Sequence, residues 1–155
     1  MFIQKLNDSF FSENSHLVEV LDKRNGVWDG HKERGYGILV ISINNLRFGI
    51  PLRSYMKHRF GFHTVESKGL DYSKAVLLSK DEYICNLPFM IPNDEFVKIK
   101  DKSRFIEKKF TDYVQGYIDA IIANDSNKLK PYAFSTLKNY HKELGLRGRL
   151  RKRKI

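Results

Sequence analysis

Residues 34–64 read RGYGILVISINNLRFGIPLRSYMKHRFGFHT, and this stretch decides the fold. Residues 36–43 are almost continuously apolar and β-branched, as in a strand that is buried on both faces. Asn44 and Asn45 follow, and asparagine tolerates the positive φ that a two-residue hairpin turn requires. The return strand alternates apolar and polar residues, which predicts a half-exposed strand that ends at Pro51. We therefore expect a hairpin that leads directly into the basic segment LRSYMKHR.

The second half of the chain changes from strand to helix periodicity. Apolar residues recur at intervals of three and four, which predicts a long helix near residues 103–123 with one face against the sheet. A second helical pattern lies near residues 132–144, and Gly145 suits the position just past a helix end. Strands followed by helices predict an α+β fold.

Length and charge limit the organisation and the partners. A chain of 155 residues favours one domain, which we place at residues 1–146. The net charge of +10 favours a polyanionic partner such as nucleic acid. Residues 142–155 contain seven basic residues and one acidic residue, so they carry +6 of this charge. We interpret residues 147–155 as a basic, flexible tail that attracts phosphate backbones non-specifically.

Cys85 is the only cysteine in the sequence. No disulfide can form within the chain, and a reducing compartment is the simplest interpretation. The sequence also contains no apolar segment long enough to serve as a signal peptide or a membrane span. We therefore expect a cytoplasmic protein without a membrane partner.

Carboxylates are missing from the central stretch, because no aspartate or glutamate lies between Arg34 and Glu66. Two-metal nuclease chemistry needs clustered carboxylates. The sequence also has no zinc motif and no glycine-rich phosphate loop. We expect neither a metal nor another cofactor.

The basic segment suits cleavage of RNA without a metal. The 2′-hydroxyl of the substrate can attack the adjacent phosphorus, while the protein accepts a proton, neutralises the phosphate oxygens and protonates the departing 5′-oxygen. Histidine titrates near neutrality, which makes His58 and His63 candidates for proton transfer. Lys57 can act as a base only where burial or neighbouring cations favour its neutral form. The arginines whose planar guanidinium groups can bind the phosphate are Arg34, Arg53 and Arg59.

The same residues also have plainer interpretations. A basic run such as residues 57–59 is most often a solvated turn, and Ser54 can cap a turn. Phe10 and Phe11 can stack on bases, but adjacent phenylalanines more often belong to a core. Spacing by itself predicts a basic, RNA-facing α+β domain and leaves catalysis open.

Three segments, in matching order and spacing, resemble the toxins of type III toxin–antitoxin systems. They are residues 34–38 (RGYGI), 49–54 (GIPLRS) and 86–92 (NLPFMIP). Residues 69–75 (GLDYSKA) fit the TenpN group better than its more distant relatives ToxN and AbiQ. The resemblance extends from about residue 2 to residue 145.

The resemblance implies both a fold and an activity. The implied fold is a compact, highly twisted antiparallel β-barrel of the MazF/Kid type, flanked by helices. The implied activity is that of a metal-independent endoribonuclease that cleaves mRNA and leaves a cyclic phosphate. A small, repeated, pseudoknotted antitoxin RNA inhibits such toxins, which cut its precursor and act in abortive infection against phage. The expected assembly is a closed, heterohexameric ring of alternating protein and RNA.

The resemblance also assigns roles to individual residues. The serine that follows the Pro-Leu pair at the end of the hairpin falls on Ser54, and the lysine shortly beyond it falls on Lys57. The basic residue at the start of the preceding strand falls on Arg34, with Lys32 as the alternative.

The sequence departs from the ToxN pattern in three places. Arg53 replaces the hydroxyl residue before the serine, and the lysine lies one position further along. Phe10 stands where the family has a tyrosine, so it can stack on a base but cannot transfer a proton. We expect His58 to compensate as an acid or base. The expected catalytic residues are Arg34, Arg53, Ser54, Lys57 and His58, and the expected RNA contacts are Phe10, Lys32, Arg59, His63 and Lys74.

Two rival interpretations lead to different functions. A non-catalytic RNA-binding module would use the same basic edge to hold a structured RNA. A phage-encoded DNA-binding protein would depend on the basic tail alone.

Overall fold

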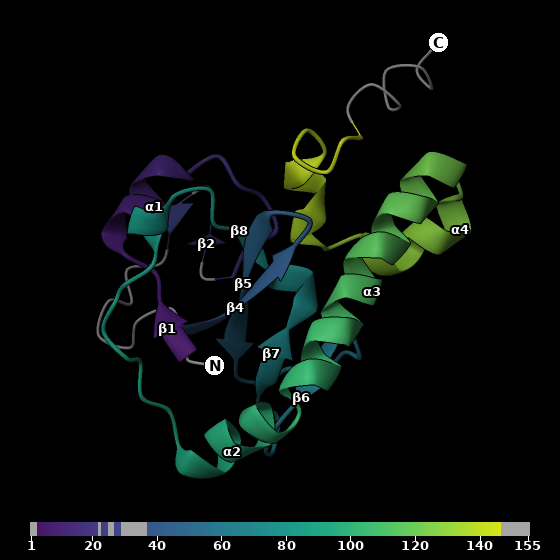
Figure 1. Cartoon of the computed structure of the whole chain (residues 1–155). Coiled ribbons are helices and arrows are strands. Elements are labelled where there is room, and N and C mark those ends of the chain that lie inside the picture. The colour runs from purple at the N-terminus through teal and green to yellow at the C-terminus, as the bar shows by residue number, and fades with distance from the viewer. Residues whose placement is uncertain (1–2, 22, 25–26, 29–36, 147–155) are drawn as a thin grey trace.

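A computed structural model describes residues 3–21, 23–24, 27–28 and 37–146 (Figure 1). Within these residues the chain forms a six-stranded antiparallel sheet, a separate two-stranded ribbon and four α-helices. The expected α+β class is therefore confirmed. No helix in the described part of the chain is long and apolar enough to cross a membrane.

Eight strands, four α-helices and four 3-10 helices lie in the described residues. The strands are β1 (Ile3–Lys5), β2 (Lys23–Arg24), β3 (Val27–Trp28), β4 (Gly37–Ile43), β5 (Leu46–Arg53), β6 (Gly61–His63), β7 (Gly69–Asp71) and β8 (Val76–Leu77). The α-helices are α1 (Asp8–Glu13), α2 (Asn93–Asp101), α3 (Ser103–Ala123) and α4 (Ser126–Leu129). The 3-10 helices are η1 (Tyr72–Lys74), η2 (Asp81–Tyr83), η3 (Lys130–Tyr132) and η4 (Thr136–Tyr140).

The central hairpin of β4 and β5 forms as predicted. Its turn residues, Asn44 and Asn45, have φ values of 48° and 69°. The prediction that Pro51 ends the return strand is wrong, because Pro51 pairs with Ile38 and the strand continues to Arg53. The strand is also more buried than predicted, since residues 48–51 are all buried and both faces of the strand are therefore covered there.

The sheet is open. Its strand order is β1-β4-β5-β7-β6, with β8 paired to β5 beside β7. The end strands β1 and β6 do not pair with each other in the described residues, so the expected barrel is not closed. Strand β5 is the centre of this arrangement, because it bonds to three other strands.

The outer edge of β1 is covered by a later segment of the chain. Leu6 forms a bridge with Ile84. The amide of Cys85 donates to the carbonyl of Lys5 at 2.8 Å, and the amide of Phe89 donates to the carbonyl of Ile3 at 3.2 Å. Strand β1 is therefore bonded on both sides, since β4 lies on its other edge.

The long helix α3 confirms the predicted helix near residues 103–123 and runs along one side of the sheet (Figure 1). Its apolar face is buried, and the Phe110 ring lies 5.6 Å from the Phe48 ring of β5. Phe105 and Ile122, at the margins of the predicted face, are exposed. The aromatic pair Phe48 and Phe110 thus joins helix and sheet in the core.

The predicted helix near residues 132–144 is wrong. The short 3-10 helices η3 and η4 and a series of turns occupy this region. The Ser135 hydroxyl oxygen accepts a hydrogen bond from the amide of Leu137, and the Thr136 hydroxyl donates one to the carbonyl of Ala75. These side-chain bonds compete with helical ones and attach the segment to the chain beside β8. Gly145 does terminate the turns with a φ of 76°, as expected.

Candidate functional site

Asp71, the last residue of β7, lies at the centre of a polar cluster at the end of β5. Its side chain is completely buried. Its Oδ2 atom accepts a hydrogen bond from Arg53 Nη1 at 2.7 Å and lies 3.0 Å from His58 Nε2. Its Oδ1 atom accepts from the Ser73 amide at 3.0 Å and from the Ser73 hydroxyl at 2.6 Å. We call these four residues the Asp71 cluster.

The sheet brings the members of the Asp71 cluster together. Arg53 ends β5 and pairs with Gly69, two residues before Asp71 on β7. Gly61 of β6 pairs with Asp71 itself, so the loop between β5 and β6 must return to the same place. The Asp71 side chain also caps η1 through the Ser73 amide, at the turn that connects β7 to β8.

His58 is oriented by two contacts at once. The Phe60 amide donates to its Nδ1 atom at 3.0 Å, so Nδ1 carries no proton in this arrangement. The ring proton is therefore on Nε2, which donates to Asp71. His63 reaches the same loop, since its Nε2 atom lies 2.8 Å from the His58 carbonyl oxygen. Both ring nitrogens of His58 are thus engaged within the protein.

Aromatic side chains adjoin the polar cluster. The Phe60 ring lies 5.6 Å from His58 and 6.3 Å from Tyr113, which also contacts Tyr72 at 6.2 Å. Burial raises the pKa of Tyr72 to about 12 and also raises the pKa of Tyr113. Both hydroxyls therefore stay protonated at neutral pH, so these tyrosines add no charge beside Asp71.

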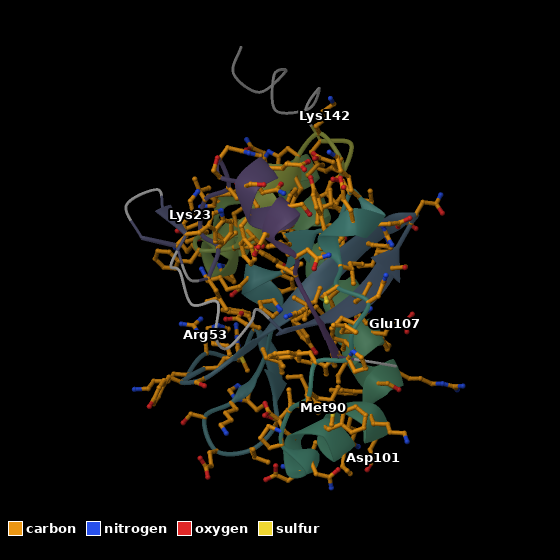
Figure 2. The ribbon with its side chains drawn as sticks, turned by 90° about the vertical axis from the view of Figure 1, so that its left-hand side faces the viewer. Lys23, Arg53, Met90, Asp101, Glu107 and Lys142 are labelled. Atoms are coloured by element: carbon orange, nitrogen blue, oxygen red, sulfur yellow. The ribbon has the colours of Figure 1, made fainter. Side chains whose placement is uncertain are left out.

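Ser54 and Lys57 lie next to the Asp71 cluster in sequence and are exposed. They belong to the loop that connects β5 to β6, and Arg53 marks its start (Figure 2). Within the described residues no hydrogen bond or ion pair holds either side chain. The loop therefore presents a hydroxyl and an ammonium to solvent beside an arginine whose direction is fixed.

Comparisons with protein families, with curated proteins and with solved structures find no match for this chain. Within residues 3–21, 23–24, 27–28 and 37–146, no three histidine, cysteine, aspartate or glutamate side chains are grouped to hold a metal ion. Both oxygens of Asp71 are already bonded to donors of the protein.

Lys74 lies on η1, close to the Asp71 cluster, but its ammonium is directed elsewhere. Its Nζ atom donates to the carbonyl of Phe134 at 2.8 Å. Burial lowers the pKa of Lys74, and the carboxylates of Glu19 and Asp71 oppose this change. Lys74 therefore ties η1 to the segment before η4, and it would have to leave Phe134 to contact a phosphate.

Phe10 cannot stack on RNA as the sequence analysis expected. Its side chain is completely buried in the core. The centroid of its ring lies 5.4 Å from that of Tyr83, 5.5 Å from that of Phe11 and 6.1 Å from that of Trp28. Tyr83 comes from a distant part of the chain, so the local FF pattern could not reveal this enclosure. The prediction for Phe10 is wrong.

The remaining predicted residues fall into two groups. Arg59 and His63 are exposed on the chain that follows Lys57, and the Arg59 guanidinium carbon lies 5.4 Å from the Phe60 ring centroid. Arg34, Lys32 and the tail at residues 147–155 lie outside the described residues. The structure thus brings Arg53 and His58 together on one carboxylate, and it leaves Lys74 and Phe10 outside that cluster.

Asp71 and Ser73 are the functional candidates that the sequence analysis missed. A signal for them exists, because Asp71 is the only acidic residue between Glu66 and Asp81 and stands two positions before a serine. An aspartate in this spacing commonly caps a turn through its own side chain. Its contact with Arg53 and His58 could not be predicted, since it depends on how β5, β6 and β7 pair.

Proposed function

We propose that this protein is a metal-independent endoribonuclease, the toxin of a type III toxin–antitoxin system, with its site at the end of β5. The observation that carries the proposal is the convergence of Arg53 and His58 on the buried carboxylate of Asp71. This convergence fixes a basic edge beside the exposed Ser54 and Lys57. A cation held in a fixed position toward a phosphate, as Arg53 is, is one of the groups that phosphoryl chemistry without a metal requires.

Arg53 is suited to hold the scissile phosphate. A guanidinium has five N–H donors in a planar fork, and the bond to Asp71 uses only one of them. The side chain also remains about one-third exposed, so a phosphate can reach the free donors. Asp71 keeps the fork in place before substrate arrives, which lowers the entropy lost on binding.

The reaction is transfer of the phosphorus to a neighbouring oxygen of the same ribose. The 2′-oxygen forms a bond to phosphorus, the bond from phosphorus to the 5′-oxygen breaks, and the products are a 2′,3′-cyclic phosphate and a 5′-hydroxyl. The 2′-hydroxyl loses a proton and the 5′-oxygen gains one. Lys57 is the group proposed to exchange protons with the reacting oxygens and to neutralise charge on the phosphate. Ser54 donates a hydrogen bond to a phosphate oxygen. His58 orients the loop while both its nitrogens are bound, and it can exchange a proton once one of them is released.

The proposal extends to the partners. A small pseudoknotted antitoxin RNA would occupy the same basic edge in a closed ring of protein and RNA, and cellular mRNA would be the target of the free toxin in the cytoplasm. The net charge of +10 supports a polyanionic partner. The MazF/Kid-like character of the fold and the role in abortive infection against phage stay predictions.

A non-catalytic RNA-binding module is the second candidate. The observation that favours it is that the protein itself engages both nitrogens of His58 and the ammonium of Lys74. Groups held in this way can position a phosphate without exchanging protons. The two candidates share their phosphate contacts and differ only in whether the RNA is cut.

A cleavage assay tests the proposal. Purified protein that has been freed of RNA is incubated with a long RNA in EDTA, and the ends of the products are mapped. The wild type should make discrete cuts that end in a cyclic phosphate, while Lys57→Ala should make none. Lys100→Ala is the control, since Lys100 is an exposed lysine on α2. Loss of activity in EDTA with recovery in magnesium, or unchanged cleavage by Lys57→Ala, would contradict the mechanism. Folded protein that binds RNA without cutting it would establish the second candidate.

A further inference from the structure

Tyr55 differs from most other tyrosines of the described chain. It is 77% exposed, whereas Tyr72, Tyr83 and Tyr113 are buried. Within the described residues its ring makes no contact with another aromatic ring or with a cation. A large, rigid aromatic group thus projects from the loop of the Asp71 cluster without contributing to the core.

The next residue explains why Tyr55 points outward. Met56 is 2% exposed, and its amide donates to the Ser67 carbonyl at 2.7 Å. Its thioether fills a space that two glycines leave open: a Cβ atom on Gly61 would lie 2.8 Å from the Met56 sulfur, and one on Gly69 would lie 2.4 Å from its terminal methyl. With Met56 anchored inward under β6 and β7, the chain carries Tyr55 to the outside.

The backbone of Tyr55 is strained by this arrangement. Its φ is 57°, in the left-handed region that asparagine and glycine adopt easily and a tyrosine adopts at a cost of about 1–2 kcal/mol. An exposed side chain gains little packing to offset that cost. A residue that suited the fold alone would be asparagine, as at the other turn of β5. Strained residues of this kind gather at functional sites.

The cations around Tyr55 are placed to bind the phosphates of a nucleic acid strand. Arg53 and Lys57 lie two positions before and after it, and Arg59 follows on the same loop. Cations beside an exposed ring can hold consecutive phosphates while the ring receives the base between them. The π-face accepts any base, but only a base that is not enclosed in a duplex.

We propose that Tyr55 is a stacking platform for an unpaired base, so that the segment of RNA bound at this loop is single-stranded even where the rest of the RNA is folded. This inference rests on the proposed function and deepens it. Stacking on Tyr55 would draw the adjacent phosphate toward Arg53 and leave duplex RNA without its main non-ionic contact. The ring then acts in binding, and the bonds that form and break remain those of the ribose and phosphate.

The test compares two short single strands that carry 2′-O-methyl groups to prevent cleavage, one with bases and one abasic at every position. The wild type should bind the strand with bases more tightly. Tyr55→Ala should lose about 5- to 100-fold in affinity for that strand and bind the abasic strand as the wild type does. Tyr55→Phe should retain wild-type binding, and the salt dependence of binding should be the same in all variants, since the phosphate contacts are unchanged.

Two control variants separate stacking from folding. Tyr55→Asn suits the positive φ and should lose affinity while the loop stays folded. Phe105→Ala removes an exposed ring on α3 that lies 5.6 Å from Lys109 Nζ and should bind like the wild type. Equal affinity of Tyr55→Ala and wild type for the strand with bases, or an equal loss on both strands, would overturn this inference alone. A wild type that binds neither strand nor any structured RNA would overturn the proposed function with it.

Discussion

Strand β5 carries an arginine–aspartate pair near each end, and the two pairs have almost the same length. Arg47 lies 2.6 Å from Asp81, and Arg53 lies 2.7 Å from Asp71. The Asp81 side chain is 94% exposed, whereas the Asp71 side chain is completely buried. Distance therefore says little about the importance of an ion pair, because water surrounds the carboxylate of Asp81 whereas the protein surrounds that of Asp71.

The turns at the two ends of β5 differ in the same way. Asn44 and Asn45 supply the positive φ values of the β4–β5 turn, and asparagine is suited to that backbone. Tyr55 supplies the positive φ after the other end, and tyrosine is not suited to it. One end of β5 is thus built for the fold, and the other end keeps features that the fold does not need.

The largest expected effect is the loss of Asp71. Asp71→Ala removes the acceptor of Arg53, His58 and Ser73 and should lower the free energy of unfolding by about 2–3 kcal/mol. Asp81→Ala at the exposed pair should change it by less than about 0.5 kcal/mol. Urea unfolding measures both values. Equal losses at the two ends would show that burial does not separate the pairs.

Adding a methyl group at Gly69 tests how tightly Met56 packs beneath the loop between β5 and β6. The added Cβ would lie 2.4 Å from the Met56 methyl and 2.4 Å from the backbone oxygen of Phe62, so β6 and β7 must separate. Gly69→Ala should cost about 1–3 kcal/mol in thermal or urea unfolding. Gly49→Ala, toward the other end of β5, meets the movable end of the Ile38 side chain first and should cost less. The reverse order would contradict the anchoring of Met56.

Exchanging the residue types of the two turns should change the stability by smaller amounts, and the two substitutions should have opposite signs. Asn45→Tyr places a side chain unsuited to a φ of 69° and should destabilise the protein by about 1 kcal/mol. Tyr55→Asn relieves the corresponding strain and should stabilise it by up to about 1 kcal/mol. Thermal unfolding of the two variants gives both signs. Loss of stability in Tyr55→Asn would mean that the tyrosine ring supports the fold after all.

The smallest expected effect is a pH dependence of stability at His141, which follows η4 and contacts α3. Burial lowers the pKa of His141 from its usual 6.5, and its Nε2 atom contacts the Tyr117 hydroxyl. The unfolded chain therefore binds this proton more readily, so stability is lost as pH falls from 6.5 toward the pKa of the folded state. His141→Gln removes the titration but can still accept from Tyr117, whose pKa burial raises to about 12. The variant should show a flatter stability profile across this range, and an unchanged slope would contradict the assignment.

The sequence correctly predicted the elements that are determined by residues close together in the chain. The β4–β5 turn depends on two adjacent asparagines, and α3 depends on a repeat along one continuous segment. The predicted helix near residues 132–144 failed because Ser135 and Thr136 bond to neighbouring and distant backbone groups. The barrel failed to close because β1 and β6 stay apart, and no residue pattern within either strand records that separation.

The sequence predicted the members of the candidate site that are neighbours in the chain, but not the member that comes from another strand. The basic segment drew attention to Arg53, Ser54, Lys57 and His58, and the structure places them on one loop and strand end. Their common acceptor, Asp71, follows on another strand and could not be assigned without the strand pairing. The burial of Phe10 depends in the same way on Tyr83, which lies far along the chain.

The double coverage of β1 has a consequence for how the chain is made. One edge of β1 bonds to β4, and the other bonds to Ile84, Cys85 and Phe89. On a ribosome the β4–β5 hairpin can close as soon as β5 has emerged, because its two strands are neighbours in sequence. Strand β1 emerges earlier but cannot be covered on both edges until the segment ending at Phe89 has also emerged. A nascent chain halted before that point would carry β1 with an open edge, in a form suited to capture by a chaperone or by another chain.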